Sequence, residues 1–186
     1  PLYNTLPVDL QKTKILFALM FLLRGIPFVD LAYLRKTDIQ GNILRYRRRK
    51  TGRSLTVMLI PEALRLMQLV ANKDGDSPYL FPFLSSPEGT ETAYHEYQSA
   101  LRAFNHRLSV LKRYVRGHAH LSTYTIRHTW ATMAYYCEIH PGIISEAMGH
   151  SSIKVTETYL KPFQNQKIDK ANQEVISFVK GYASVF

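Results

Sequence analysis

A change in hydrophobic period is the feature that most constrains how this chain folds. Between residues 37 and 60, apolar and polar side chains alternate in steps of two, and turn residues at 41–42 and 50–52 interrupt the alternation. This pattern is typical of a three-stranded antiparallel meander with two tight turns. The segments on both sides carry apolar residues at helical spacing. We therefore expect a mainly α fold with a small three-stranded antiparallel β-sheet near the N-terminal third.

Helices are expected on both sides of the meander. Residues 8–23 and 27–34 have helical patterns, and Gly25 stands just beyond the end of the first. Residues 74–90 contain Pro and Gly without periodicity and are expected to be irregular. The remaining predicted helices are a segment opening at Pro61, one at 94–111, one capped by Ser122 or Thr123, one from Pro141 to Gly149, one bearing Tyr159 near its end, and one at 166–180.

Composition narrows the class of partner. Of the 186 residues, 24 are Lys or Arg and 14 are Asp or Glu, so the net charge is +10. A domain this basic is expected to bind a polyanion, nucleic acid first, with general surface basicity as the alternative. The apolar run at 15–23 is too short to cross a membrane. The single cysteine, Cys137, is expected to be a buried, inert thiol in a reducing compartment.

Tyr159 and His150 are the first candidates for chemistry. A phenol attacks phosphate at neutral pH only when cations and proton carriers converge on that phosphate. His150 stands nine residues before Tyr159, directly after the helix stop at Gly149. We expect its side chain to point from a helix junction rather than into a core. A packing tyrosine and a capping histidine are the alternatives.

Two arginines could supply the cations. Arg127 adjoins the apolar stripe of its helix, so we expect a buried stem and a guanidinium that faces a cleft, or else a buried carboxylate partner. Tyr124, three residues earlier, falls on the same predicted face, where its hydroxyl could reach the same ligand. Arg24 ends an apolar helix, where it interacts with the helix dipole, a carboxylate such as Asp30, or a bound anion.

The second predicted strand is strongly basic. Alternation places Arg48 and Lys50 on one face and three further arginines on the other. Two basic faces favour DNA, although an edge strand protected by its charge is the alternative. Lys50, at the hairpin tip, is mobile enough to deliver a proton. The predicted DNA-contacting residues are Arg45, Arg47, Arg48, Arg49 and Arg53.

Other kinds of site have weaker support. His118 and His120 resemble a metal pair, but no carboxylate or cysteine cluster accompanies them. The sequence contains no phosphate-binding Gly-Lys-Thr loop, no dinucleotide fingerprint and no serine elbow. We therefore expect neither a metal nor a cofactor.

Several segments together resemble the catalytic domain of tyrosine recombinases, the phage integrase family. They are Leu-Arg-Gly at 23–25, Arg-Lys-Thr-Gly at 49–52, Tyr-Thr-Ile-Arg-His-Thr-Trp-Ala-Thr at 124–132, Met-Gly-His at 148–150 and Thr-Tyr at 158–159. They occur in the family's order and spacing, and the resemblance extends from about residue 8 to about residue 165. One position departs from the usual pattern, because Tyr124 stands where family members carry a histidine. A tyrosine hydroxyl can donate a hydrogen bond to phosphate but is a poorer acid.

The resemblance implies roles for five residues. Tyr159 would attack the scissile phosphodiester and form a 3′-phosphotyrosyl link. Arg24 and Arg127 would clamp the non-bridging oxygens. Lys50 would protonate the leaving 5′ oxygen, and His150 would bind the phosphate or assist the nucleophile. The covalent link conserves bond energy, so neither ATP nor a metal is required.

The same resemblance implies an assembly. The enzyme would cleave and rejoin double-stranded DNA as a homotetramer during integration or excision of a mobile element, passing through a Holliday junction. It would act away from membranes, in a bacterial or phage-type cytoplasm at the nucleoid. Asp30, at a position that is usually acidic in the family, would hold the catalytic cations in place without contacting the substrate.

The resemblance also divides the chain. Residues 1–165 would form the catalytic domain, and residues 166–186 a helical tail that docks on a neighbouring subunit. We see no N-terminal DNA-binding domain in this sequence and expect weak binding by this unit alone. A type IB topoisomerase and a DNA-binding regulator without activity are the competing interpretations.

Overall fold

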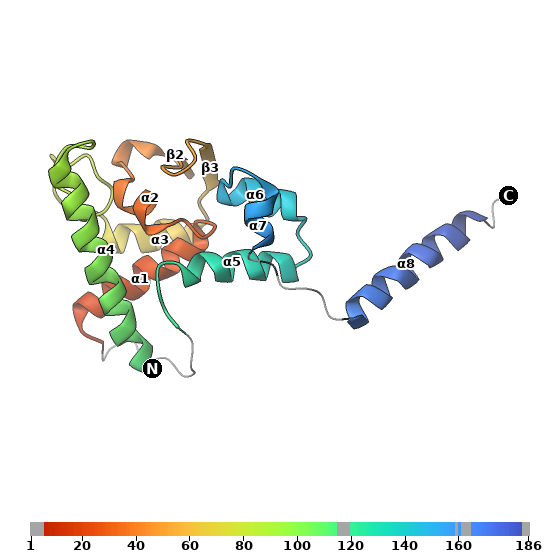
Figure 1. The fold of residues 1–186 in the computed structure, drawn as a ribbon. Coiled ribbons are helices and arrows are strands. Elements are labelled where there is room, and N and C mark those ends of the chain that lie inside the picture. The colour runs from red at the N-terminus through yellow and green to blue at the C-terminus, as the bar shows by residue number, and fades with distance from the viewer. Residues whose placement is uncertain (1–5, 115–119, 159, 161–164, 184–186) are drawn as a thin grey trace.

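The computed structural model describes residues 6–114, 120–158, 160 and 165–183. The fold is mainly α with a small antiparallel sheet, which confirms the predicted class (Figure 1). The helices are α1 (Val8–Leu22), α2 (Phe28–Tyr33), α3 (Pro61–Val70), α4 (Glu91–Leu111), α5 (Thr125–Tyr136), α6 (Pro141–Met148), α7 (Ile153–Glu157) and α8 (Asn165–Ala183). The strands are β1 (Ile39–Gln40), β2 (Ile43–Arg47) and β3 (Ser54–Met58), in the order β1-β2-β3.

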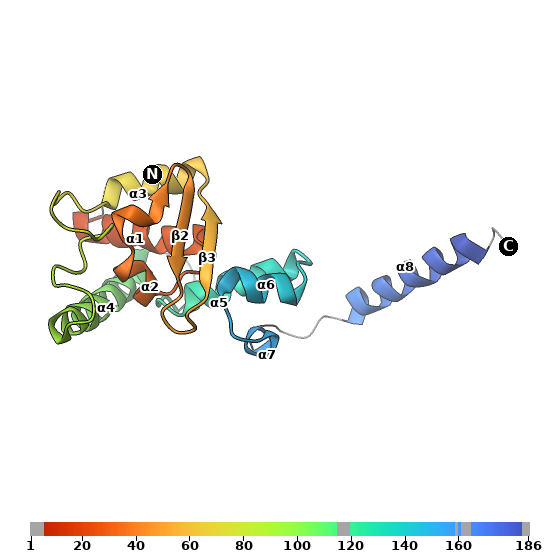
Figure 2. The same cartoon turned by 90° about the horizontal axis from the view of Figure 1, so that it is seen from above.

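The sheet turns one face to the domain and the other to solvent. In the antiparallel β2–β3 pair, Leu44 lies opposite Val57 and Tyr46 opposite Leu55, and all four are buried. The residues that alternate with them, including Arg45, are exposed, as the period of two requires. Figure 2 shows the sheet between α1 and α2 on one side and α6 on the other. The β2–β3 hairpin therefore borders two parts of the domain.

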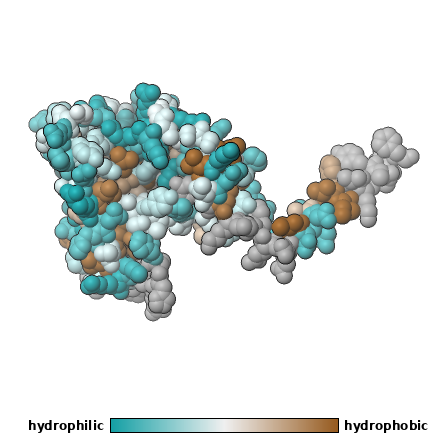
Figure 3. Space-filling model, viewed as in Figure 1, coloured by the Kyte–Doolittle hydropathy of each residue, from teal (hydrophilic) through white to brown (hydrophobic). Residues whose placement is uncertain are grey.

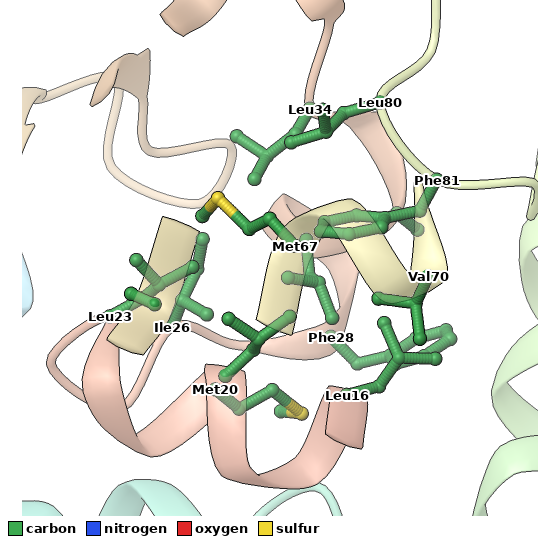
Figure 4. Packing of buried hydrophobic residues seen from close by; sticks show 14 of the residues in the cluster. Leu16, Met20, Leu23, Ile26, Phe28, Leu34, Met67, Val70, Leu80 and Phe81 are labelled. Carbon is green, nitrogen blue, oxygen red and sulfur yellow. The ribbon is translucent and has the colours of Figure 1, made fainter. Parts of the chain in front are cut away.

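The main core forms where α1 contacts α3 and α4. Met20 of α1 and Leu23, directly after α1, lie close to Met67 of α3, and Phe28 and Phe81 belong to the same cluster (Figure 4). Helix α1 also contacts α5, so it is covered on several sides and is apolar around much of its circumference. The rigid core thus positions the C-terminal end of α1 against α5.

A smaller cluster joins α5 to α6. Ala131, Ile144 and Met148 are buried there, and Trp130 packs against them. The cluster does not extend to Cys137, which is exposed, so the prediction of a buried thiol is wrong. The reason is that the last turn of α5 is already uncovered, since Met133 and Tyr136 are about half exposed there, and Cys137 follows directly.

Helix α8 extends away from the other elements (Figures 1 and 2). Its apolar side chains Ile168, Val175 and Phe178 are each more than half exposed, and brown atoms mark apolar surface along the helix in Figure 3. Near its start, Lys167 pairs with Glu138 at 3.3 Å. Within the described part of the chain, no helix combines the length and apolarity that crossing a membrane requires.

Candidate active site

Arg127 bridges two turns from inside the domain. Its side chain is on α5 and only 5% exposed. Nη1 donates to the carbonyl of Gly25 at 2.8 Å, and Nη2 donates to the carbonyl of Met148 at 2.7 Å. The sequence led us to expect a cleft or a carboxylate; the structure instead gives Arg127 carbonyls beyond α1 and at the end of α6. Such carbonyls carry partial negative charge, which suits a cation.

The turn after α1 is tight and unusual. Arg24 has φ +60° and Gly25 has φ +67°. A Cβ on Gly25 would stand 3.0 Å from the Cα of Arg127, so the close approach of α5 requires glycine there. Positive φ at an arginine costs about 1–3 kcal/mol, and such strain is found preferentially at functional sites. With Arg53, Arg24 lines an open cleft of about 540 Å³ between β3 and α6.

His150 is buried, contrary to the expectation that it points out from a junction. Its side chain is 4% exposed, and Nδ1 lies 2.8 Å from the hydroxyl of Thr156, which is fully buried. The chain reverses at Gly149, with φ +66°, and Leu55 of β3 covers this point. Burial and, after it, the Arg127 charge lower the pKa of His150 to about 4, so the ring is neutral at pH 7.

An ion pair secures the β2–β3 hairpin to α2. Arg48 is 6% exposed and binds Asp30 at 2.8 Å, while the other oxygen of Asp30 accepts the backbone N–H of Arg49 at 3.0 Å. Burial raises the pKa of Asp30, and the Arg48 charge opposes that rise. Arg48 therefore has a partner inside the domain, and we leave it out of the DNA-contacting set. Lys50 does not share its face, because strand β2 ends at Arg47 and Lys50 is exposed in the turn.

The other hairpin arginines reach the surface. Arg45 donates to Gln40 at 2.9 Å, and Arg47 donates to the carbonyl of Gly52 at 2.7 Å. Arg53 is exposed beside the cleft. Each of these three guanidiniums can bind a further hydrogen-bond acceptor, because an arginine carries five N–H donors.

Arg49 occupies a different setting from its neighbours. Its guanidinium lies 3.8 Å from the centroid of the Tyr33 ring and pairs with Glu88. Glu88 also binds Arg35 at 2.8 Å, and the two arginines hold the pKa of this carboxyl below its usual value. A phosphate that binds Arg49 would therefore have to compete with Glu88.

The predicted cations converge on one region. Burial raises the pKa of Tyr46, and the charges of Arg48, Arg127 and Arg24 oppose that rise, so all three lie near one buried phenol. Burial is the largest cause of the lowered pKa of His150. The other causes are the charges of four cations, Arg127, Arg48, Lys50 and Arg53. The structure thus brings Arg24, Lys50, Arg127 and His150 together around the hairpin, the end of α1 and the α6–α7 junction.

Two other candidates are placed differently. Tyr124, just before α5, is 60% exposed, and its ring meets that of His128 edge-on with 4.2 Å between centroids. It is therefore far more exposed than Arg127, although both lie at the start of α5. Tyr159 and His118 lie outside the described residues; α7 ends at Glu157. Among the residues that are described, no cluster of His, Cys, Asp or Glu could hold a metal ion.

Sequence reasoning missed two threonines. Thr156 engages the ring of His150, and the hydroxyl of Thr51, in the hairpin turn, donates to the carbonyl of Gly149 at 3.0 Å. Neither contact has a sequence signal, because the first crosses a helix break and the second joins residues 98 positions apart.

A sequence model described as "Phage integrase family" matches residues 3–166. No curated protein matches the chain closely enough to count as a relative.

Solved structures share the fold. XerA recombinase has 18% identity and a TM-score of 0.58, and the alignment covers 94% of this chain and 63% of that one. A Tn1549 transposon integrase in complex with transposon right end DNA has 16% identity and a TM-score of 0.63, with 94% and 62% covered. XerH site-specific recombinase bound to difH has 16% identity and a TM-score of 0.54, with 90% and 48% covered. The chain spans less than two thirds of the length of each of these proteins.

The family model covers most of the chain, and the structural likeness carries the same fold at low identity. The chain belongs to the phage integrase family.

Proposed function

We propose that this protein is a site-specific DNA recombinase that cleaves and rejoins DNA through a 3′-phosphotyrosyl intermediate. One observation carries the proposal: buried Arg127 ties the turn that bears Arg24 to the end of α6, beside His150. This bracing supports preorganised binding of a phosphate, in which donors need no rearrangement at the moment of reaction. Membership of the phage integrase family supports the same activity.

The proposed cleavage step assigns each bond. The Oη of Tyr159 bonds to phosphorus as the bond from phosphorus to the 5′ oxygen breaks. Lys50 gives a proton to that oxygen, and the phenolic proton passes to His150 or water. Arg24 and Arg127 offset the charge that develops on the non-bridging oxygens. Attack by a 5′ hydroxyl on the phosphotyrosyl link reverses these steps and rejoins the strand.

His150 would serve as a neutral ring in either of its two proposed roles, because burial and the Arg127 charge lower its pKa to about 4. Its Nδ1 lies 2.8 Å from the hydroxyl of Thr156, and we assign to Nε2 the contact with the phosphate or with the nucleophile. Tyr124 would add a hydrogen bond to phosphate from the start of α5.

The substrate would be double-stranded DNA. Arg45, Arg47, Arg49 and Arg53 would contact phosphates along the hairpin, and several known relatives of this fold are solved with DNA. Affinity would fall steeply with salt, because phosphate contacts release counterions. The proposed active form is a homotetramer on DNA that serves a mobile element, and its substrate would place it at the nucleoid in the cytoplasm.

Helix α8 would serve assembly. Its exposed apolar side chains, including Val175 and Phe178, need a partner surface, and we propose that residues 166–186 dock on a neighbouring subunit. The double change Val175→Asp and Phe178→Asp should abolish the higher-order DNA complex in sedimentation experiments while binding of a single protomer persists. An unchanged complex would show that α8 is not the assembly element.

The central test needs no knowledge of the target sequence. A pool of nicked duplexes with randomised sequence is incubated with the full chain, and adducts that survive denaturation are isolated and sequenced. We expect covalent adducts on a defined sequence, all lost in Tyr159→Phe. The matched control is Tyr94→Phe, because Tyr94 is exposed on α4 away from the site.

The outcome also separates the alternatives. Binding without any adduct would identify a DNA-binding regulator. Adducts that lead only to relaxation of supercoiled DNA, without strand exchange between two duplexes, would identify a topoisomerase.

A further inference from the structure

The turn that carries Lys50 is exposed, yet its proposed task demands accurate placement. Lys50 lies between β2 and β3 and is itself exposed. A group that transfers a proton must stand within about 2.6–3.2 Å of the receiving atom. Lysine has a flexible four-carbon stem, so a moving turn would add a second source of displacement. Something in the protein should therefore hold the turn in place.

Local hydrogen bonds shape the turn but do not place it. Arg48 and Arg53 are joined by a backbone bond of 2.7 Å, and the N–H of Gly52 donates to the carbonyl of Arg48 at 2.7 Å. Gly52 has φ +71°, which a glycine adopts without strain. All these bonds lie inside the hairpin, so they move with it. Contacts to other elements must decide where the turn sits.

Contacts to other elements lie at both ends of the turn. At its base, Asp30 of α2 holds Arg48 and the backbone of Arg49, and Glu88 pairs with the Arg49 side chain. At its tip, the hydroxyl of Thr51 donates to the carbonyl of Gly149 at 3.0 Å. Thr51 follows Lys50 directly, so this bond acts within one residue of the lysine.

The acceptor of the Thr51 bond belongs to the other half of the site. Gly149 precedes His150, and the preceding carbonyl, of Met148, accepts from Arg127. Two successive carbonyls at the end of α6 thus receive the buried arginine and the hairpin turn. Lys50, His150 and Arg127 are therefore linked through neighbouring backbone groups.

We propose that Thr51 is a positioning residue, whose hydroxyl seats the Lys50 turn on the α6–α7 junction so that Lys50 meets the leaving 5′ oxygen. The inference rests on the proposed function, since it concerns the proton that Lys50 delivers. Thr51 itself contacts no substrate atom in this scheme. Its effect is confined to the protonation of the leaving group.

The test changes the leaving atom. In a nicked duplex whose scissile bridging 5′ oxygen is replaced by sulfur, a thiolate leaves. A thiol has a pKa of about 8.5, whereas water has a pKa of about 15.7, so the thiolate departs without the proton that an alkoxide needs. A defect in proton delivery is therefore relieved by sulfur, and a defect in folding or phosphate binding is not.

Adduct formation is measured in single turnovers on the oxygen and sulfur versions of the duplex trapped from the random pool. Thr51→Val keeps the shape and removes the donor. We expect it to be about tenfold slower on oxygen, equivalent to about 1.4 kcal/mol, and within about twofold of the unchanged protein on sulfur. Thr51→Ser should match the unchanged protein on both. Lys50→Ala provides the reference pattern, and exposed Thr92→Val on α4 provides the matched control.

Three results would overturn the inference: equal slowing of Thr51→Val on both duplexes, no slowing on oxygen, or a Lys50→Ala defect that sulfur does not relieve. Absence of any adduct with the unchanged protein would instead refute the proposed function. Thermal unfolding of each variant, compared with Thr92→Val, checks that the fold persists.

Discussion

The two halves of the candidate site carry similar charges in opposite surroundings. Around Arg127 and His150, cation and ring are buried and held by hydrogen bonds of 2.7–2.8 Å to carbonyls and a hydroxyl. On the hairpin, Arg45 and Lys50 are exposed, and the position of Lys50 depends on the turn that carries it. The buried groups are held in place before DNA binds, so a mutation there should also lower the stability of the fold. The exposed groups can adjust to the DNA. Variants in the two halves should therefore separate stability from activity.

The largest contrast is expected between Arg127→Ala and Lys50→Ala. The first leaves the carbonyls of Gly25 and Met148 without their donor, so we expect a loss of about 3 kcal/mol in the free energy of unfolding. Lys50→Ala should change that free energy by less than about 0.5 kcal/mol. Both should slow adduct formation, Arg127→Ala by about 1,000-fold. Urea unfolding and single-turnover assays measure the two effects; equal losses of stability would contradict the division.

Acid should weaken the buried half selectively. The folded pKa of His150 is about 4, below the ordinary 6.5, so the unfolded chain takes up a proton first as pH falls. Stability is then highest above pH 6.5 and is lost between pH 6.5 and 4, by about 3 kcal/mol from this residue. His150→Gln should flatten that part of the profile in urea unfolding at several pH values. His128, whose pKa is also lowered by burial, remains in both proteins. An unchanged profile would mean that His150 does not cause the loss.

Arg24→Gly should separate strain from chemistry. Glycine adopts φ +60° without strain, which stabilises the folded state, but it also increases the entropy of the unfolded chain, which lowers the stability. Because the two effects oppose each other, we expect the free energy of unfolding to change by less than about 1 kcal/mol. Adduct formation should fall by about 100-fold, because one phosphate clamp is lost. A stable variant with full activity would remove Arg24 from the site. A variant that unfolds would mean that the arginine supports the fold.

The smallest effect is expected at the exposed arginines. Arg45→Ala should weaken DNA binding only a few-fold and reduce the slope of log affinity against log salt by about 0.9. Arg48→Ala is the matched partner, since it leaves buried Asp30 without its cation and should lower stability instead. Fluorescence anisotropy at several salt concentrations measures the slope. If Arg48→Ala reduced the slope of log affinity against log salt more than Arg45→Ala did, our assignment of the two residues would be reversed.

Much of the fold followed from local patterns. Residues 37–60 alternate in steps of two, and the sheet lies there; Gly25 and Gly149 predicted helix ends, and both have positive φ next to those ends. The predictions that missed concern burial. Cys137 lies beyond the end of its helix, and Arg48 is covered by Asp30 from another element. A one-dimensional pattern shows periodicity but not which neighbour covers a face.

The sequence by itself determined the element types, the basic charge and the family, because periodicity, composition and spaced motifs are local properties. Only the tertiary structure decided that Arg127 binds two carbonyls, that His150 is buried against Thr156, and that Thr51 joins the hairpin to the α6–α7 junction. For the bonds of Arg127 and Thr51, the physical reason is distance along the chain. These hydrogen bonds join residues 21 to 102 positions apart and form only after the core has brought α1, α5, α6 and the sheet together. The His150–Thr156 contact joins residues six positions apart, but it requires the reversal of the chain at Gly149.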